Sequence, residues 1–208
     1  MTARKQKEPE INRDGLLKAA AAEFASRGLQ GARLEAIAAE ARITRAMIYY
    51  YFGGRDGLYL ATLEESYRRI REAEAAIDLR GLDPVESMRK ITRFRIDYYV
   101  QNPSLVALVA IENQNQASYI KGSREIRSQA GASLDALQSV LRQGQEAKVF
   151  RTGIDIVELH QLMVSMGMFN VANQHTFGAV FSRNMTSPRR LKRTRDWACE
   201  VVLRFLAA

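Results

Sequence analysis

The sequence predicts an all-α protein of about nine helices in two layers. Apolar residues recur at helical spacing between polar caps and Pro or Gly stops, and no alternating strand pattern of useful length appears. The 208 residues are 47% hydrophobic and 26% charged, with only 13 Gly and 4 Pro. Such a composition is typical of a folded chain with a sizeable core. We expect a three-helix N-terminal domain over residues 1–54 and a larger helical domain over residues 55–208.

The N-terminal helices have the clearest start and stop signals in the sequence. Helical spacing of apolar residues between Pro9 and Gly28 predicts the first helix. A second, short helix is expected over residues 34–41. A third is expected from Arg45, after the possible N-cap Thr44, to about Tyr50, with a break at Gly53-Gly54. Two short helices joined by so few residues predict a helix-turn-helix.

The larger domain is divided by its prolines and caps. Asp83-Pro84, Asn102-Pro103 and Ser187-Pro188 are typical helix boundaries. The expected helices cover residues 55–78, 84–100, 104–113, 123–146, 155–174 and 188–208.

The charge balance favours a polyanionic partner. The chain carries a formal net charge of +8, and phosphate backbones bind Lys and Arg through counterion release. The start, Met1 to Glu10, is polar, and no stretch approaches the ~18 apolar residues of a membrane span. We therefore expect a cytoplasmic protein with no membrane partner.

Few residues suit catalysis or metal binding. One cysteine, Cys199, excludes an internal disulfide framework and predicts a small packing residue. The two histidines lie apart in sequence from each other and from this cysteine, and no phosphate-binding glycine loop, nucleophile elbow or metal-ligand spacing appears. We expect no enzyme activity, no catalytic residues, no metal and no cofactor.

The third helix has two different sides. At about 100° per residue, one side is expected to pack and holds Met47, Ile48 and Tyr51. The other is expected to be free and holds Arg45, Ala46, Tyr49 and Tyr50. Arg can bind a guanine edge, Ala can touch a thymine methyl, and Tyr can bond phosphate, so this side suits DNA. In the alternative interpretation, the three consecutive tyrosines fill a core or an interface.

The run of residues 41–58, with Ala19-Ala20, Phe24, Gly28 and Ile37-Ala38 upstream, resembles the signature of the TetR/AcrR family of regulators. The resemblance covers residues 16–58. By position it implies that Tyr51 stands where the family often has a phosphate-binding His, and that Arg55 matches a Lys at the next helix start. The implied DNA contacts are Thr44, Arg45, Ala46, Tyr49, Tyr50, Tyr51 and Arg55, and the charge of Arg33 adds it as a further candidate.

Two positions depart from the family pattern. Arg42 replaces the glycine of the turn, and a positive φ there would cost about 1 kcal/mol. Ala32-Arg33 replaces the hydroxyl residues that cap the next helix and touch phosphate. The charge of Arg33 offers a replacement for that phosphate contact.

For the larger domain, the resemblance implies an effector cavity and a dimer interface. It describes a ligand-responsive regulator that binds a palindromic operator as a homodimer and is released by a small-molecule effector. Repression is favoured over activation, because a dimer lying across a promoter blocks polymerase without a second contact surface. The candidates for orienting an aromatic or carboxylate-bearing effector are Tyr98, Asn113, His160, Asn170, Asn173 and His175. The alternative function is a helical protein-interaction module without sequence-specific DNA binding.

The dimer is expected to form through the last two long helices, residues 155–174 and 187–208. The apolar stripe expected to pair there is Leu191, Ala198, Val202 and Phe205.

Two other basic segments need an interpretation. The densest run, Arg189, Arg190, Lys192, Arg193 and Arg195, is interpreted as the solvated face of an amphipathic helix and not as the DNA site. The tail residues Arg4, Lys5 and Lys7 suit contacts to a DNA backbone or minor groove, or form a solvated tail.

Overall fold

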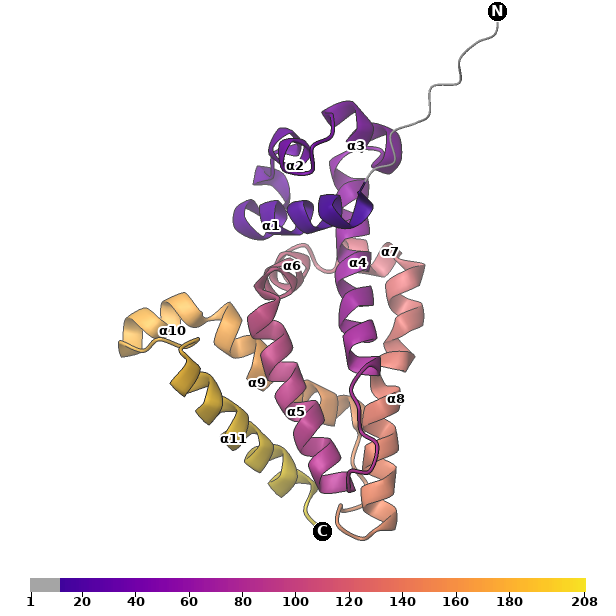
Figure 1. Cartoon of the computed structure of the whole chain (residues 1–208), viewed down its shortest axis with the longest axis vertical. Coiled ribbons are helices and arrows are strands. Elements are labelled where there is room, and N and C mark those ends of the chain that lie inside the picture. Colours follow the sequence, from indigo (N-terminus) through magenta and orange to yellow (C-terminus); the bar gives the residue numbers. More distant parts are fainter. Residues whose placement is uncertain (1–11) are drawn as a thin grey trace, which may run out of the picture. The chain divides into compact units, whose positions relative to one another are not determined.

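The computed structural model describes residues 12–208, apart from the side chains of residues 130, 132 and 133. Within these residues the structure contains eleven helices and one isolated backbone bridge, between Phe150 and Ala207 (Figure 1). The all-α class is confirmed. The interpretation of Arg4, Lys5 and Lys7 concerns residues outside the described part. Among the described helices, none is long and apolar enough to cross a membrane.

The described chain forms two compact units, which divide between Glu65 and Ser66. The division falls inside helix α4 (Arg55–Ala75), so α4 contributes residues to both units. The domain boundary expected between residues 54 and 55 separates the DNA-binding part from the effector-binding part, and it stays a prediction.

The first unit is a three-helix domain extended by the start of α4. It contains α1 (Arg13–Gly31), α2 (Leu34–Glu40) and α3 (Arg45–Phe52). Phe24 and Tyr59 meet edge to face at the centre, with ring centroids 5.0 Å apart. Gly28 has φ 71° and kinks α1, which then continues to Gly31 instead of ending at Gly28 as expected. The apolar core of this unit includes Leu16, Leu17, Ala20, Leu29, Ile37, Ile48, Leu58 and Leu63.

The turn between α2 and α3 has a left-handed residue at Arg42, the position where the family glycine is replaced. Arg42 has φ 56°, and its N–H donates to the Ala39 carbonyl over 3.1 Å. The next N–H, of Ile43, donates to the Ala38 carbonyl over 2.9 Å. The condition for strain at Arg42, a positive φ, is therefore met, and these bonds close the turn despite the strain of a side chain in this region.

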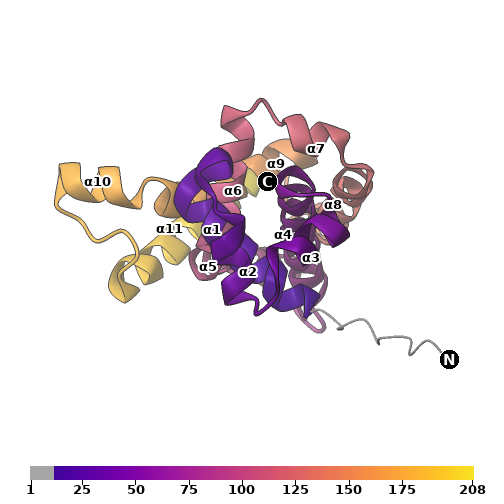
Figure 2. The same ribbon diagram turned by 90° about the horizontal axis from the view of Figure 1, so that it is seen from above.

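The second unit contains the end of α4 and seven more helices in the described chain. Their bounds are α5 (Pro84–Gln101), α6 (Pro103–Gln114), α7 (Ser118–Gly122), α8 (Arg124–Glu146), α9 (Ile156–Ala172), α10 (Gln174–Phe181) and α11 (Pro188–Leu206). The expected helices did not include α7 and α10, so the structure has eleven helices in the described residues where about nine were expected. Asp83, Ser123 and Asp155 cap α5, α8 and α9 through side-chain oxygens. Figure 2 shows α10 projecting away from α5, α8 and α9.

The core of the second unit forms around α5, which packs against α8, α9 and α11. Met88, Ile96, Leu137 and Leu159 are buried there. The stripe expected to pair two subunits also lies here: Leu191, Ala198 and Val202 are buried inside the chain, and Phe205 packs partly against this core. That detail of the dimer prediction is wrong, because apolar periodicity does not distinguish packing within a chain from packing between chains.

Candidate DNA-binding surface and interior polar cluster

Helix α3 presents an exposed polar and aromatic face. Thr44 caps it by accepting a hydrogen bond from the Met47 N–H over 3.3 Å, and Gly53 ends it with φ 72°. Ile48 is completely buried and Met47 is half-buried, as the helical phase predicts. On the other side, Arg45, Ala46, Tyr49 and Tyr50 are exposed. The exposed side therefore has the chemistry expected of a DNA-reading face.

Tyr51 does not pack as helical phase predicted. Its side chain is 40% exposed, and its ring meets the ring of Tyr50 edge to face at 5.0 Å. The placement of Tyr51 on the packed side is wrong, because the residue lies in the last turn of an eight-residue helix, where little of the unit covers it. Its exposed position is compatible with the phosphate contact that the resemblance implied.

Arg45 is held in place by two neighbours. Its Nη1 donates to Glu35 of α2 over 2.7 Å, and its Nη2 donates to the Tyr49 hydroxyl over 3.1 Å. The guanidinium also lies 5.4 Å from the centre of the Tyr49 ring. The bond with Tyr49, and then the charge of Glu35, raise the pKa of Arg45. An oriented guanidinium on an exposed helix face can donate two bonds to a guanine edge.

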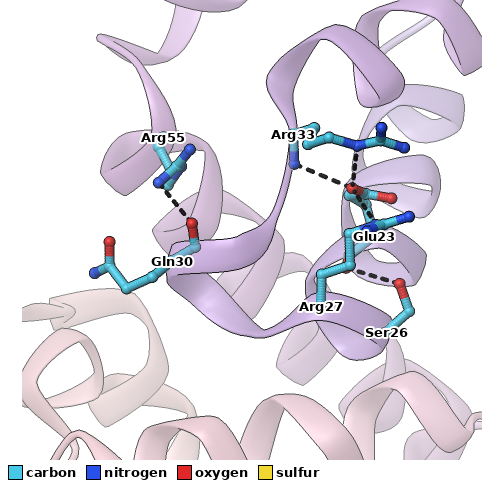
Figure 3. A network of polar contacts seen from close by, with 6 residues as sticks. All are labelled: Glu23, Ser26, Arg27, Gln30, Arg33 and Arg55. Atoms are coloured by element: carbon cyan, nitrogen blue, oxygen red, sulfur yellow. Dashed lines mark hydrogen bonds and ion pairs between the residues drawn. The ribbon is translucent and has the colours of Figure 1, made fainter.

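Arg55 lies near Arg45, and one of its donors is used by a hydrogen bond inside the same unit. Its Nη1 donates to the Gln30 carbonyl over 3.1 Å, near the end of α1 (Figure 3). A surface hollow of about 330 Å³ is lined by Arg45, Tyr49 and Arg55 together with Gln30, Leu34, Glu35 and Asp56. The structure thus brings three of the implied DNA contacts to one place.

Arg33 is exposed at the start of α2, where its own side chain makes no cap. The carboxylate of Glu23, on α1, accepts the Arg33 backbone N–H over 3.0 Å and pairs with Arg27 at 3.1 Å (Figure 3). Glu23 thereby satisfies the N–H of the N-cap residue, which is the bond that the glutamate of a capping box makes. The Arg33 side chain is 61% exposed, and its Nε pairs with the same Glu23 carboxylate at 3.8 Å (Figure 3).

The second unit holds a polar cluster in its interior. Arg95 of α5 is only 2% exposed, and its Nη1 lies 2.9 Å from Oε1 of Glu74 on α4. This is an ion pair without a well-aligned hydrogen bond, since neither atom has a hydrogen-bond partner in the structure. Arg71, one turn before Glu74, pairs with the other carboxylate oxygen. Two guanidinium groups therefore share one buried carboxylate.

His160 of α9 lies within the electrostatic influence of this cluster. Burial first, and then the positive charges of Arg95 and Arg71, lower the pKa of His160 to about 4. The imidazole is therefore neutral at pH 7, and its buried Nδ1 has no hydrogen-bond partner in the structure. Burial also raises the pKa values of Tyr98 and Tyr99 on α5, and the charge of Arg71 acts on both. We name Arg71, Glu74, Arg95 and His160 the Arg95 cluster.

Only part of the expected effector set lies near this cluster. Tyr98 and His160 do, whereas Asn113 and His175 are exposed elsewhere. Each of the three asparagines donates to a carbonyl one turn earlier: Asn113 to Val109, Asn170 to Met166 and Asn173 to Phe169. The structure does not bring the six residues together, because three of them satisfy their own helices.

The sequence contained a signal for Arg95 that was not used. Met88, Ile91, Arg95 and Tyr99 follow one another at spacings of three and four, so Arg95 occupies a core position of α5. A charged residue at a core position of an amphipathic helix needs a buried partner. Its partner Glu74 lies 21 positions earlier, on another helix, and nothing local in the sequence indicates it.

The exposed face of α3 within a helix-turn-helix, together with an all-helical second unit, defines the class of helix-turn-helix DNA-binding regulators. A family model described as bacterial regulatory proteins, tetR family, matches residues 16–62. A second model, for a tetracyclin repressor-like C-terminal domain, matches residues 84–202. The chain belongs to the TetR family of transcriptional regulators.

Curated relatives match over most of their length. The chain is 32% identical over 185 residues to the HTH-type transcriptional repressor NicS of Pseudomonas putida, covering 89% of this chain and 86% of the relative. It is 31% identical over 167 residues to the HTH-type transcriptional repressor SCO4008 of Streptomyces coelicolor, covering 79% and 81%. Both relatives are regulators.

Solved structures share the fold at low identity. The fatty acid degradation regulator FadR from Bacillus halodurans has a TM-score of 0.67 at 18% identity, covering 94% of this chain and 97% of that one. The TetR transcriptional regulator SCO0520 from Streptomyces coelicolor has a TM-score of 0.57 at 21% identity, covering 94% and 98%.

Proposed function

We propose that this chain is a cytoplasmic, non-catalytic repressor that binds a palindromic operator as a homodimer and is released by a small-molecule effector. Residues 1–54 bind DNA, and residues 55–208 bind the effector and the second subunit. The observation that carries the proposal is the exposed face of α3, where Arg45 is held by Glu35 and Tyr49 beside Arg55. The two curated relatives, both named as repressors, support the sign of regulation.

The dimer has a different apolar surface available from the one expected. Trp197 and Val201, one turn apart on α11, are 37% and 39% exposed. On α9, Val157 and Phe169 are 57% and 45% exposed. A single helix-turn-helix reads only a few base pairs, so two copies on a palindrome give the affinity that an operator requires. We therefore keep α9 and α11 as the pairing helices, with these exposed residues in contact.

The reading face is tested by selecting operator sequences with the full chain and measuring binding by fluorescence anisotropy. The double variant Arg45→Ala, Tyr49→Phe is expected to weaken operator binding at least about tenfold while helicity and the dimer persist. Arg193→Ala is the matched control, because Arg193 is exposed on α11 in the rival basic run. Unchanged binding by the double variant would remove α3 as the reading face, and a selective loss in Arg193→Ala would move it to α11.

The alternative, an interaction module that binds no specific DNA, predicts no enriched sequence in that selection. Repression is tested separately with a promoter reporter in cells that have or lack the gene. Higher reporter output without the gene supports repression, and lower output shows activation.

A further inference from the structure

The Arg95 cluster carries more positive than negative charge. Arg95 and Arg71 both pair with Glu74, and one carboxylate neutralises only one of them. The only other carboxylate among the buried described residues of this unit, Glu112, accepts the Ile120 N–H at α7 over 3.1 Å. His160 is neutral and adds no compensating charge. Arg71, Glu74, Arg95 and His160 together therefore carry one net positive charge.

Arg95 also has a buried donor, Nε, that no protein group uses. Its Nε and Nη1 are buried and have no hydrogen-bond partner in the structure, although the side chain is 2% exposed. A buried guanidinium is stabilised when a planar anion accepts two parallel hydrogen bonds from it. Nε and Nη1 face opposite edges of the guanidinium, so Glu74, which lies at Nη1, leaves the edge of Arg95 that carries Nε without an acceptor. An organic carboxylate has the matching geometry and the missing charge.

Apolar groups lie one helical turn away from the charged ones on each of three helices. On α5, Tyr99 follows Arg95 by four residues; on α4, Ile70 precedes Glu74 by four. On α9, Val164 follows His160 by four, and it packs against the apolar cluster that contains Tyr99 and Ile70. A ligand with a charged end and an apolar body matches this arrangement, whereas inorganic phosphate would leave the apolar part without a partner.

Glu74 reaches Arg95 from a separate helix. Among the described helices, α4 and α5 are not in extensive close packing, and long side chains join them at this level. Arg71 and Glu74 lie on the same helix and keep their pairing when the carboxylate rotates away from Arg95. A ligand carboxylate can thus replace Glu74 at Arg95 without leaving Glu74 unpaired.

We propose that the Arg95 cluster binds the carboxylate of a small organic monoanion, whose apolar body lies against Ile70, Tyr99 and Val164. The inference rests on the proposed function, in which this monoanion is the effector. Arg95 binds the carboxylate through the edge of the guanidinium that carries Nε, and His160 contributes a neutral ring nitrogen to a further polar group of the ligand. Specificity then comes from the shape of the apolar body, and affinity comes from the buried charge pair.

The test uses the full chain and three carboxylates, each against its uncharged amide: benzoate, phenylacetate and hexanoate at 5 mM and constant ionic strength. At least one carboxylate is expected to raise Tm by about 2 °C or more, because a ligand that binds only the folded state stabilises it. Its amide is expected to leave Tm unchanged. Equal shifts with acid and amide, or no shift with any of the three acids, would overturn the proposal.

Variants locate the binding. Arg95→Met is expected to abolish the carboxylate-dependent shift, and Arg95→Lys, which keeps the charge but not the planar fork, to reduce affinity about tenfold. Arg93→Met, at a half-exposed arginine of the same helix, is the matched control and should retain the shift. If Arg95→Met does not fold, the Arg95→Lys comparison with Arg93→Met decides. Retention of full carboxylate affinity by Arg95→Lys, or equal losses in both, would place the anion elsewhere.

Operator binding separates this inference from the proposed function. The carboxylate that raises Tm should also weaken the operator complex of the wild type at least about fivefold, but not that of Arg95→Lys at the same concentration. Specific operator binding without any carboxylate effect refutes only the effector class. Carboxylate binding in a chain that selects no DNA sequence refutes the repressor and leaves the anion site in place.

Discussion

Arg45 and Arg95 place the same side chain in opposite surroundings. Arg45 lies on the exposed face of α3, where its pair with Glu35 is more than half exposed on both sides. Arg95 lies inside the second unit, where its pair with Glu74 is nearly inaccessible. Water can replace either partner of the first pair, so Arg45 can exchange Glu35 for a base at little cost. The interior pair has no such substitute, and exchange there requires another anion.

The difference between the two arginines is tested most directly by removing the carboxylate that pairs with each, Glu74 or Glu35. Glu74→Ala is expected to lower the free energy of unfolding by about 3 kcal/mol, because it leaves buried guanidinium groups without a counter-charge. Glu35→Ala should leave the urea midpoint unchanged. Urea denaturation of both variants beside the wild type checks this. Similar small effects would show that water already solvates Arg95.

A pH series sharpens the contrast at His160. The pKa of His160 is about 4 in the folded chain and near 6.5 when unfolded, so the unfolded chain binds the proton first as pH falls. The stabilisation from the neutral ring is complete above pH 6.5 and is lost as the pH falls toward 4. Between pH 7.5 and 5.0 the wild type should lose about 1 kcal/mol more than His160→Gln, less than full linkage gives because the ring is part-exposed. Equal losses in the free energy of unfolding for the wild type and His160→Gln, measured by urea denaturation at the two pH values, would contradict this prediction.

At the exposed pair, the expected effect is on specificity. Glu35→Gln removes the charge that orients Arg45 and also a negative charge beside the DNA surface. Operator affinity relative to a scrambled duplex should fall roughly fivefold, since the ion pair no longer restrains the guanidinium and nonspecific phosphate binding rises. Anisotropy with both duplexes measures the ratio. Glu40→Gln, at an exposed acid of the same helix, is the control and should change both affinities together.

A third arginine gives the smallest effect, through its backbone. Arg42 has φ 56°, a region in which a side chain is strained. Arg42→Gly should raise the free energy of unfolding by about 0.5 kcal/mol, because relief of strain is partly offset by the entropy of glycine in the unfolded chain. Thermal or urea unfolding shows the sign. A loss of stability would mean that the Arg42 side chain makes contacts that outweigh the strain.

The sequence predicted the first unit well because its signals are local. The Thr44 cap, the left-handed Arg42 and the break at Gly53 depend on residues within a few positions of one another. The burial of Ile48 follows from helical phase alone. Tyr51 was misplaced because phase does not tell how far a neighbouring surface extends beyond the last turn.

The second unit was less predictable because its decisive contacts are distant in sequence. The apolar face of α11 was correctly identified as apolar, but Leu191 and Val202 pack within the chain. The Arg95 cluster joins α4, α5 and α9, which are distant in sequence. The effector residues were predicted from their polar side chains alone, and the asparagines among them instead bond to carbonyls of their own helices. The identity of a buried partner is a tertiary property that periodicity does not encode.

The carboxylate of Glu23 has a consequence for how this regulator can evolve. Where a hydroxyl side chain starts α2, the same atom must both cap the helix and meet the DNA backbone, so any replacement sacrifices two properties together. Here Glu23 accepts the N–H at position 33 from a neighbouring helix, and the side chain of Arg33 has no capping duty. Position 33 can therefore change its charge or length to suit a new promoter while the fold of the reading domain stays intact.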